Sequence, residues 1–296
     1  MKACILFCLL LLTPSLPAQA GAIDQAIQLY QRGQFQKAVD LLSEWSQSSP
    51  EDAEVRLWLG KSLLKVQRWD DAIRQMEKAA ELAPNNGAYY LWLGRTYGAK
   101  ASHASFLTAI GWTKKVVETY EIARKLAPNN IDIRFDLLSF YLHAPAVVGG
   151  GQDRAEAEAA AIANLDPKEG YAARAFILEK GKKWDRALSE LVQATLQFPG
   201  RPDSFMDLAD FLLQRHHFEG AATNARKALS LDANLLKAKL ILAAAQIMLG
   251  KDIAEAESSL KSMAEGKKLQ AREAFSTALR YDPDYERAKN GLSQAR

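Results

Sequence analysis

Small and apolar side chains recur along this chain at a spacing that predicts paired helices. Ala72 and Ala79 stand seven positions apart with the larger Met76 between them, and Pro84 follows five positions after Ala79. Two residues seven apart lie on the same stripe of an α-helix, where small side chains let a neighbouring helix approach closely. Proline then ends the helix, because it lacks an N–H group and its ring clashes with the preceding turn.

The same spacing recurs along most of the chain. Its end is marked by a proline in six copies and by an alanine in one: Pro50, Pro84, Pro128, Pro167, Pro199, Ala233 and Pro283. Another amphipathic segment precedes each such helix, across a turn-like stretch such as QRGQ (31–34) or KGKK (180–183). Two helices and a break, repeated at about the 34-residue interval from Pro50 to Pro84, form units that bury their apolar faces only by stacking.

This pattern resembles the tetratricopeptide repeat. The likeness is clearest in the second unit, at Leu59, Gly60, Leu63, Trp69, Ala72, Met76, Ala79 and Pro84, and it extends over nearly all of 22–285. The resemblance implies an all-α, right-handed superhelical solenoid of about six to seven helix-turn-helix repeats, whose first helices line a concave groove. We expect the last helices near 235–249, 253–265 and 268–281, and a C-terminal capping helix from 284 to about 294 with a polar outer face.

Two neighbouring units are longer than the others. Pro84 and Pro128 are 44 residues apart and Pro128 and Pro167 are 39 apart, and we expect the excess in long loops near 100–111 and 143–152. Because equivalent loops of adjacent repeats emerge at one edge of a solenoid, these two are predicted to meet. The resulting lip would include His103, Phe106, Trp112, His143, Pro145 and Val147. Such a lip could grip a partner, or it could only cover the seam between two distorted repeats.

The second of these insertions contains three consecutive glycines, 149–151, which raises the question of a phosphate-binding loop. A phosphate loop needs a lysine and a hydroxyl after its last glycine, and Gln152, Asp153 and Arg154 follow instead. The dinucleotide pattern GxGxxG also fails, because Arg154 takes the place of the third glycine and a helix precedes. We therefore interpret the glycines as a structural turn that ends a helix.

The groove is the other candidate surface. Trp58 and Trp92 stand two places before Gly60 and Gly94, whereas the family's usual large residue stands four places before, and a two-place shift turns a side chain by about 200°. Both indoles are thus predicted to face the groove, unless Trp58 packs against the neighbouring first helix. The same phasing places charged side chains along the groove, basic ones first and acidic ones in the sixth unit: Lys61, Lys65, Arg95, Asp203, Asp207 and Asp210.

The order of these charges along the groove, basic first and acidic later, has two interpretations. It is either a solvated face, or it fits an extended peptide whose acidic, aromatic-bearing part meets repeats two and three. The lysine and asparagine set that the family's cytosolic chaperone clamp requires is absent.

The first twenty residues predict a secretory signal. Lys2, an apolar run over 3–12 and the small-x-small site at 18–20 are typical of one, and the run is too short for a stable membrane anchor. We therefore expect a repeat domain over 21–296 that is exported to a periplasm or secreted. Both cysteines, Cys4 and Cys8, lie in the signal, so the exported part would have neither a disulfide nor a thiol nucleophile.

The remaining chemistry is sparse. A formal net charge of +3 is too balanced to indicate a nucleic-acid partner, and neither HExxH nor GxSxG occurs. The leading interpretation is a non-enzymatic protein–protein interaction scaffold without cofactor or metal, used in envelope or secretion assembly. The alternative is a binding module for a non-protein ligand such as envelope polysaccharide, for which six tryptophans are a weak indication. An uncharacterised enzyme is the third class.

Overall fold

The computed structural model describes residues 16–251, and all regular structure within them is helical. The α-helices are α1 (Leu16–Gln31), α2 (Phe35–Ser48), α3 (Ala53–Lys65), α4 (Trp69–Leu82), α5 (Gly87–Ser102), α6 (Phe106–Leu126), α7 (Ile131–His143), α8 (Gln152–Leu165), α9 (Pro167–Lys180), α10 (Trp184–Gln197), α11 (Pro202–Gln214), α12 (Phe218–Leu231) and α13 (Leu236–Leu249), with a short 3-10 helix η1 (Ala146–Val148). None of the helices in this part of the chain is long and apolar enough to cross a bilayer.

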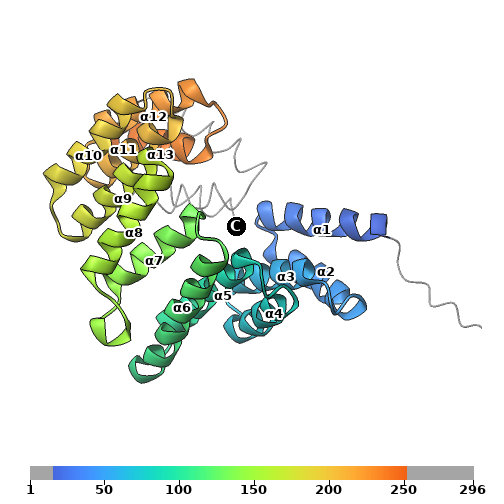
Figure 1. Ribbon diagram of the computed structural model, residues 1–296. Coiled ribbons are helices and arrows are strands. Elements are labelled where there is room, and N and C mark those ends of the chain that lie inside the picture. Colours follow the sequence, from blue (N-terminus) through green and yellow to red (C-terminus); the bar gives the residue numbers. More distant parts are fainter. Residues whose placement is uncertain (1–15, 252–296) are drawn as a thin grey trace, which may run out of the picture.

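The helices pair in chain order and the pairs stack into a curved array. Each helix packs on the next one, and the first helices of successive pairs also touch, as α1 does with α3, α3 with α5 and α7 with α9. Figure 1 shows α3, α5 and α9 toward the inner side of the curve and α4, α6 and α10 toward the outer side. The predicted all-α solenoid of helix pairs is confirmed. The helices and the cap expected beyond α13 lie outside the described residues, as do residues 1–15 of the predicted signal.

Local sequence signals begin and end these helices. Asp52, Asn86, Asn130 and Asp166 accept hydrogen bonds from backbone N–H groups at the starts of α3, α5, α7 and α9. Each of these side chains satisfies donors that the helix itself leaves unpaired. The turns inside units one, two, five and six each place a residue with positive φ two positions before the second helix: Gly33, Gln67, Lys182 and His216. The regular units therefore share one turn geometry.

The predicted stripes of small residues form the contacts between helices. Ala72, Met76 and Ala79 are all completely buried. Gly94 lies so close to α6 that a Cβ atom there would overlap the ring of Tyr120. In the preceding unit, a Cβ on Gly60 would lie 2.8 Å from the terminal carbon of Met76.

These two glycines should respond differently to the same substitution. Both sit inside helices, so replacement by alanine gains about 1 kcal/mol of helix propensity in each case. Met76 can move aside by rotating its flexible side chain, whereas the Tyr120 ring cannot, and overpacking costs about 1–3 kcal/mol. We expect Gly94→Ala to lower the free energy of unfolding by about 2 kcal/mol more than Gly60→Ala does. Urea denaturation followed by circular dichroism measures both, and equal midpoints would contradict the expectation.

The extra residues of the third unit lie in its helices, so the prediction of a long loop near 100–111 was wrong. The α5 helix continues to Ser102 and α6 begins at Phe106, so only 103–105 form the turn. As a result α6 has 21 residues, against 14 in α4. The segment contains no proline, and its one glycine, Gly111, lies within α6, where a single glycine is tolerated. A length excess alone did not distinguish a loop from longer helices.

The excess of the fourth unit does form a loop, between α7 and α8. Gly149 has a left-handed φ of 97°, and a Cβ on Gly150 would overlap the carbonyl of Ala144. The Gly151 N–H donates to the Tyr141 carbonyl at 2.9 Å, while Val148 is buried in the one-turn helix that packs on α6. The glycines thus allow a tight turn that folds back onto its own repeat.

Candidate functional site

Two tryptophans and two basic side chains alternate where α3 meets α5. The Lys61 Nζ lies 4.0 Å from the ring centroid of Trp58 and 4.3 Å from that of Trp92. The Arg95 guanidinium carbon lies 5.0 Å from the Trp92 centroid. Ammonium and guanidinium groups at such distances are attracted to the faces of aromatic rings. We call these four residues the tryptophan ladder.

Further side chains extend the ladder to the helices on either side. The ring of Tyr30 on α1 meets Trp58 edge to face at 5.6 Å, and Arg95 Nε donates to Asp136 Oδ2 on α7 at 2.6 Å. Trp58 therefore packs against the neighbouring first helix, which was the alternative stated for it, and both indoles are half-buried. The row links α1, α3, α5 and α7.

Lys61 is a buried lysine with unusual electrostatics. It is only 9% exposed, and within 16–251 it makes no hydrogen bond or ion pair. Burial, with a second contribution from the charge of Arg95, lowers the pKa of Lys61 to about 8, although Glu54 opposes the shift. Lys65, one turn later, is exposed and its Nζ lies 5.9 Å from the ring of Phe35.

A hollow of about 390 Å³ continues this face across α7, α9 and α11. Five carboxylates and no basic side chain line this hollow, which lies wholly within the described part of the chain; the acids are Asp136, Glu169, Glu179, Asp207 and Asp210. The rings of Phe135, Phe176 and Phe211 supply most of its apolar lining. The hollow combines an apolar surface with negative charge, which is the environment that a cationic side chain with an apolar stem fits. We call it the acidic hollow.

Most of the carboxylates in the acidic hollow already form ion pairs with basic side chains that do not line it. Asp207 and Glu169 bind the Nζ of Lys168 at 2.6 and 3.1 Å, and Asp210 binds Lys237 at 2.8 Å. Glu179 makes no ion pair or hydrogen bond with residues 16–251, and burial raises its pKa, although the charge of Arg215 opposes the shift. Burial also raises the pKa of Glu169. The hollow is therefore less negative than its list of acids indicates.

Sequence reasoning placed Asp207 and Asp210 in the groove but missed Glu169, Phe176 and Glu179. These three stand on one stripe of α9, at intervals of seven and three residues, so helical phasing of the fifth unit would have found them. Asp203 was also predicted to line the sixth unit. Its carboxylate instead binds Arg201 at 2.6 Å and Lys168 at 3.2 Å.

The rings of three predicted lip residues, His103, Trp112 and His143, pack against other parts of the repeats. The ring of His103 stacks on Trp69 of the second unit at 4.7 Å, and Trp112 lies 5.6 Å from Tyr97 of its own unit. His143 turns the other way, with its ring 6.0 Å from that of Phe176. Phe106 is exposed, like Pro145 and Val147.

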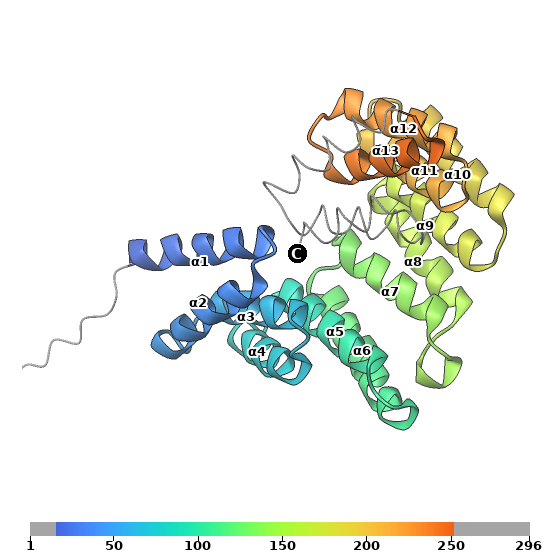
Figure 2. The ribbon, with the colours of Figure 1, turned by 180° about the vertical axis from the view of Figure 1, so that it is seen from behind.

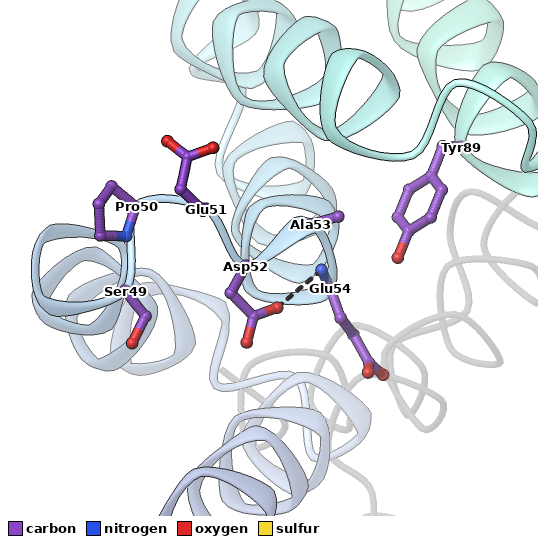
Figure 3. A pocket seen from close by; sticks show the side chains of 7 residues that line it. All are labelled: Ser49, Pro50, Glu51, Asp52, Ala53, Glu54 and Tyr89. Atoms are coloured by element: carbon purple, nitrogen blue, oxygen red, sulfur yellow. Dashed lines mark hydrogen bonds between the residues drawn. The ribbon is translucent and has the colours of Figure 1, made fainter. Parts of the chain in front are cut away.

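A second, open hollow of about 600 Å³ lies at the start of α3 and is lined by 49–54 and Tyr89. Figure 3 shows the Asp52 carboxylate turned back to the helix start, where it accepts the N–H of Glu54 at 2.9 Å. Because this cap occupies the helix terminus and Glu51 and Glu54 add negative charge, the hollow does not suit an anion. Within 16–251 no three His, Cys, Asp or Glu side chains are grouped to hold a metal ion.

Comparison with known proteins identifies the repeat. A sequence model of the tetratricopeptide repeat matches residues 29–95. The fold is similar to that of yeast Tom70, with a TM-score of 0.50 and 20% identity over 88% of this chain and 51% of Tom70. Residues 29–95 are tetratricopeptide repeats. The matched segment contains all four residues of the tryptophan ladder.

Two other tetratricopeptide-repeat proteins of known structure have lower TM-scores. A thermophilic protein of Thermus thermophilus is 17% identical, with a TM-score of 0.47 over 77% of this chain and 99% of that one. YrrB, which has an unusual peptide-binding site, is 20% identical, with a TM-score of 0.38 over 67% and 95%. A search of curated protein sequences found no match. The tetratricopeptide fold itself is consistent with a protein–protein interaction scaffold.

Proposed function

We propose that this protein is an exported, non-enzymatic scaffold that binds an extended segment of another protein on the face formed by the tryptophan ladder and the acidic hollow. The observation that carries the proposal is the continuity of this face. Arg95 of the ladder is bound to Asp136, and Asp136 also lines the hollow. A ligand lying along the first helices would therefore meet indoles and cations first, then phenyl rings and carboxylates.

The charges favour one direction for the ligand. Lys61 has two indole rings beside its ammonium group but makes no ion pair within 16–251, so an acidic side chain of a partner would complete its surroundings. A basic side chain would fit the acidic hollow, where Glu179 has no ion-pair partner within 16–251. We therefore propose a segment with an acidic part over repeats two and three and a basic part over repeats four to six.

Export and a role in envelope or secretion assembly are part of the proposal, and the signal-like residues 1–20 support them. Intact-mass measurement of the protein isolated from cells should give a chain that begins near Gly21, and retention of 1–20 would contradict export. The polysaccharide alternative has less support, because Lys61 occupies ring faces of Trp58 and Trp92 that a sugar would need for stacking.

The ladder is tested by in-cell crosslinking with mass spectrometry. We expect the natural protein to crosslink to one envelope protein and the double variant Trp58→Ala, Trp92→Ala to lose that crosslink. Buried aromatic anchors are worth on the order of 2 kcal/mol each, or about 30-fold in affinity. The matched control is Trp184→Ala, since Trp184 stacks on Arg215 away from the ladder. With circular dichroism showing folded variants, a crosslink that survives the double substitution, or none in the natural protein, would refute the proposal.

A further inference from the structure

The most exposed large apolar side chains of the described chain belong to its two lengthened repeats. Phe106 and Leu107 are 81% and 80% exposed at the start of α6, and Val147 is 80% exposed in the loop between α7 and α8. Leaving such side chains in water forgoes hydrophobic stabilisation, so their occurrence on two neighbouring units indicates an interaction site. We call residues 103–107 and 144–148 the apolar tip.

The apolar tip projects from the array. Figures 1 and 2 show the turn between α5 and α6 and the loop between α7 and α8 extending from the same side of the curve. With 21 residues, α6 is seven longer than α4, which adds about 10 Å of helix. Phe106, Leu107 and Val147 line neither the acidic hollow nor the open hollow at the start of α3. These exposed side chains therefore lie outside both hollows, whereas the anchors of protein–protein interfaces typically fill pockets.

The two chain stretches that carry the apolar tip contain no acidic residue. No aspartate or glutamate occurs in 82–117 or in 137–152, and these two stretches include both parts of the tip. Lys114 and Lys115 are exposed on α6, and Lys114 stands seven residues after Leu107 on the same outward stripe. Acidic residues follow these stretches: Glu118 stands one turn after Lys114, and Asp153 lies at the start of α8. Asp70 binds Lys100 at 2.7 Å.

We propose that the apolar tip docks on the surface of an anionic lipid bilayer. Phe106, Leu107 and Val147 would enter the boundary between headgroups and acyl chains, while Lys114 and Lys115 contact lipid phosphates. Exposed apolar side chains with exposed lysines on the same stripe of a helix are complementary to such a surface. The contact is peripheral and reversible, it leaves the tryptophan ladder free, and it does not depend on the proposed function.

Vesicle cosedimentation tests this proposal. The probe is the full protein as isolated, with vesicles of phosphatidylglycerol and phosphatidylcholine in equal parts and with phosphatidylcholine alone. We expect binding to the mixed vesicles, weakened by salt, and little binding to the neutral ones. The variant Phe106→Glu, Leu107→Glu should fall to the level of the neutral vesicles. Neutralising Lys114→Gln and Lys115→Gln should weaken binding about fivefold for each lysine.

The matched control is Leu196→Glu, Leu231→Glu, which places two carboxylates on exposed leucines of α10 and α12 instead. It should bind like the natural protein. Every variant carries the same N-terminus, so the difference between the two glutamate pairs is the readout even if residues 1–20 are retained. Equal binding by both pairs, or no binding of the natural protein to mixed vesicles, would overturn the proposal, and the second result would favour a protein partner at this edge.

Discussion

Replacing Lys168 by methionine should lower the free energy of unfolding by about 3–5 kcal/mol, the largest loss we expect from a single substitution in this protein. Lys168 is only 2% exposed, and its Nζ lies 2.6 Å from Asp207, 3.1 Å from Glu169 and 3.2 Å from Asp203. Methionine fills a similar volume without charge. It would leave the carboxylates of α9 and α11 close together without the cation that joins them.

The matched control for this substitution is Lys237→Met. Lys237 also binds a carboxylate, Asp210 at 2.8 Å, but its side chain is 53% exposed, so we expect a loss below about 1 kcal/mol. The midpoint of urea denaturation at neutral pH measures both variants. Similar midpoints for Lys168→Met and Lys237→Met would contradict the structural role of Lys168.

The cost of Lys168→Met should also depend on pH. Burial alone would raise the pKa of Asp203, but a hydrogen bond from Arg201 and the charge of Lys168 lower it to about 2. Asp203 therefore contributes stability that is complete above the unfolded pKa of about 4 and is lost as the pH falls toward 2. Without Lys168 the carboxylates bind protons more readily, so a fall in pH lowers the free energy of unfolding of the variant by less than that of the natural protein. We expect the difference between variant and natural protein to shrink from neutral pH to about pH 3.

The contrast between Lys168 and the helix stripes shows what the sequence could predict. The stripes of Ala72 and Ala79, and the prolines that end them, act within one unit, so local spacing sufficed for the fold. Lys168 follows Pro167 and reads as an exposed residue at a helix start. It is buried only because α11, more than thirty residues later, brings Asp203 and Asp207 over it. No local pattern contains that information.

The candidate site also has parts that local sequence predicts and parts that it does not. A two-place shift from the family pattern was enough to select Trp58 and Trp92, because helical phase is a local property. The position of Lys61 between them was not predicted, since it depends on how closely α3 and α5 approach. The long loop predicted near 100–111 was wrong for a related reason: the extra residues were assigned to a loop, whereas the sequence around Phe106 continues both helices.

Lys61 should titrate near pH 8, about two units below an ordinary lysine. At pH 8 about half of its side chains would then be neutral, roughly 100-fold more than for a lysine of ordinary pKa near 10.4. Only the neutral amine reacts with acylating reagents. The check is the pH dependence of acetylation under limiting acetic anhydride, read for each lysine by mass spectrometry, with the exposed Lys65 as the internal reference. Identical pH profiles for Lys61 and Lys65 would contradict the expectation.

Substitutions can separate the two causes that lower the pKa of Lys61, which are burial and the charge of Arg95. Trp58→Ala with Trp92→Ala admits water to the ammonium group and should raise the pKa of Lys61 toward its ordinary value, because burial is the main cause. Removing the second cause, the charge of Arg95, should give a smaller rise. The lowered pKa of Lys61 has a consequence for binding, because the tryptophan ladder loses positive charge as the pH rises through about 8. A partner held by an acidic side chain at Lys61 should therefore bind more weakly above that pH. A partner held only by the indoles would show no such dependence.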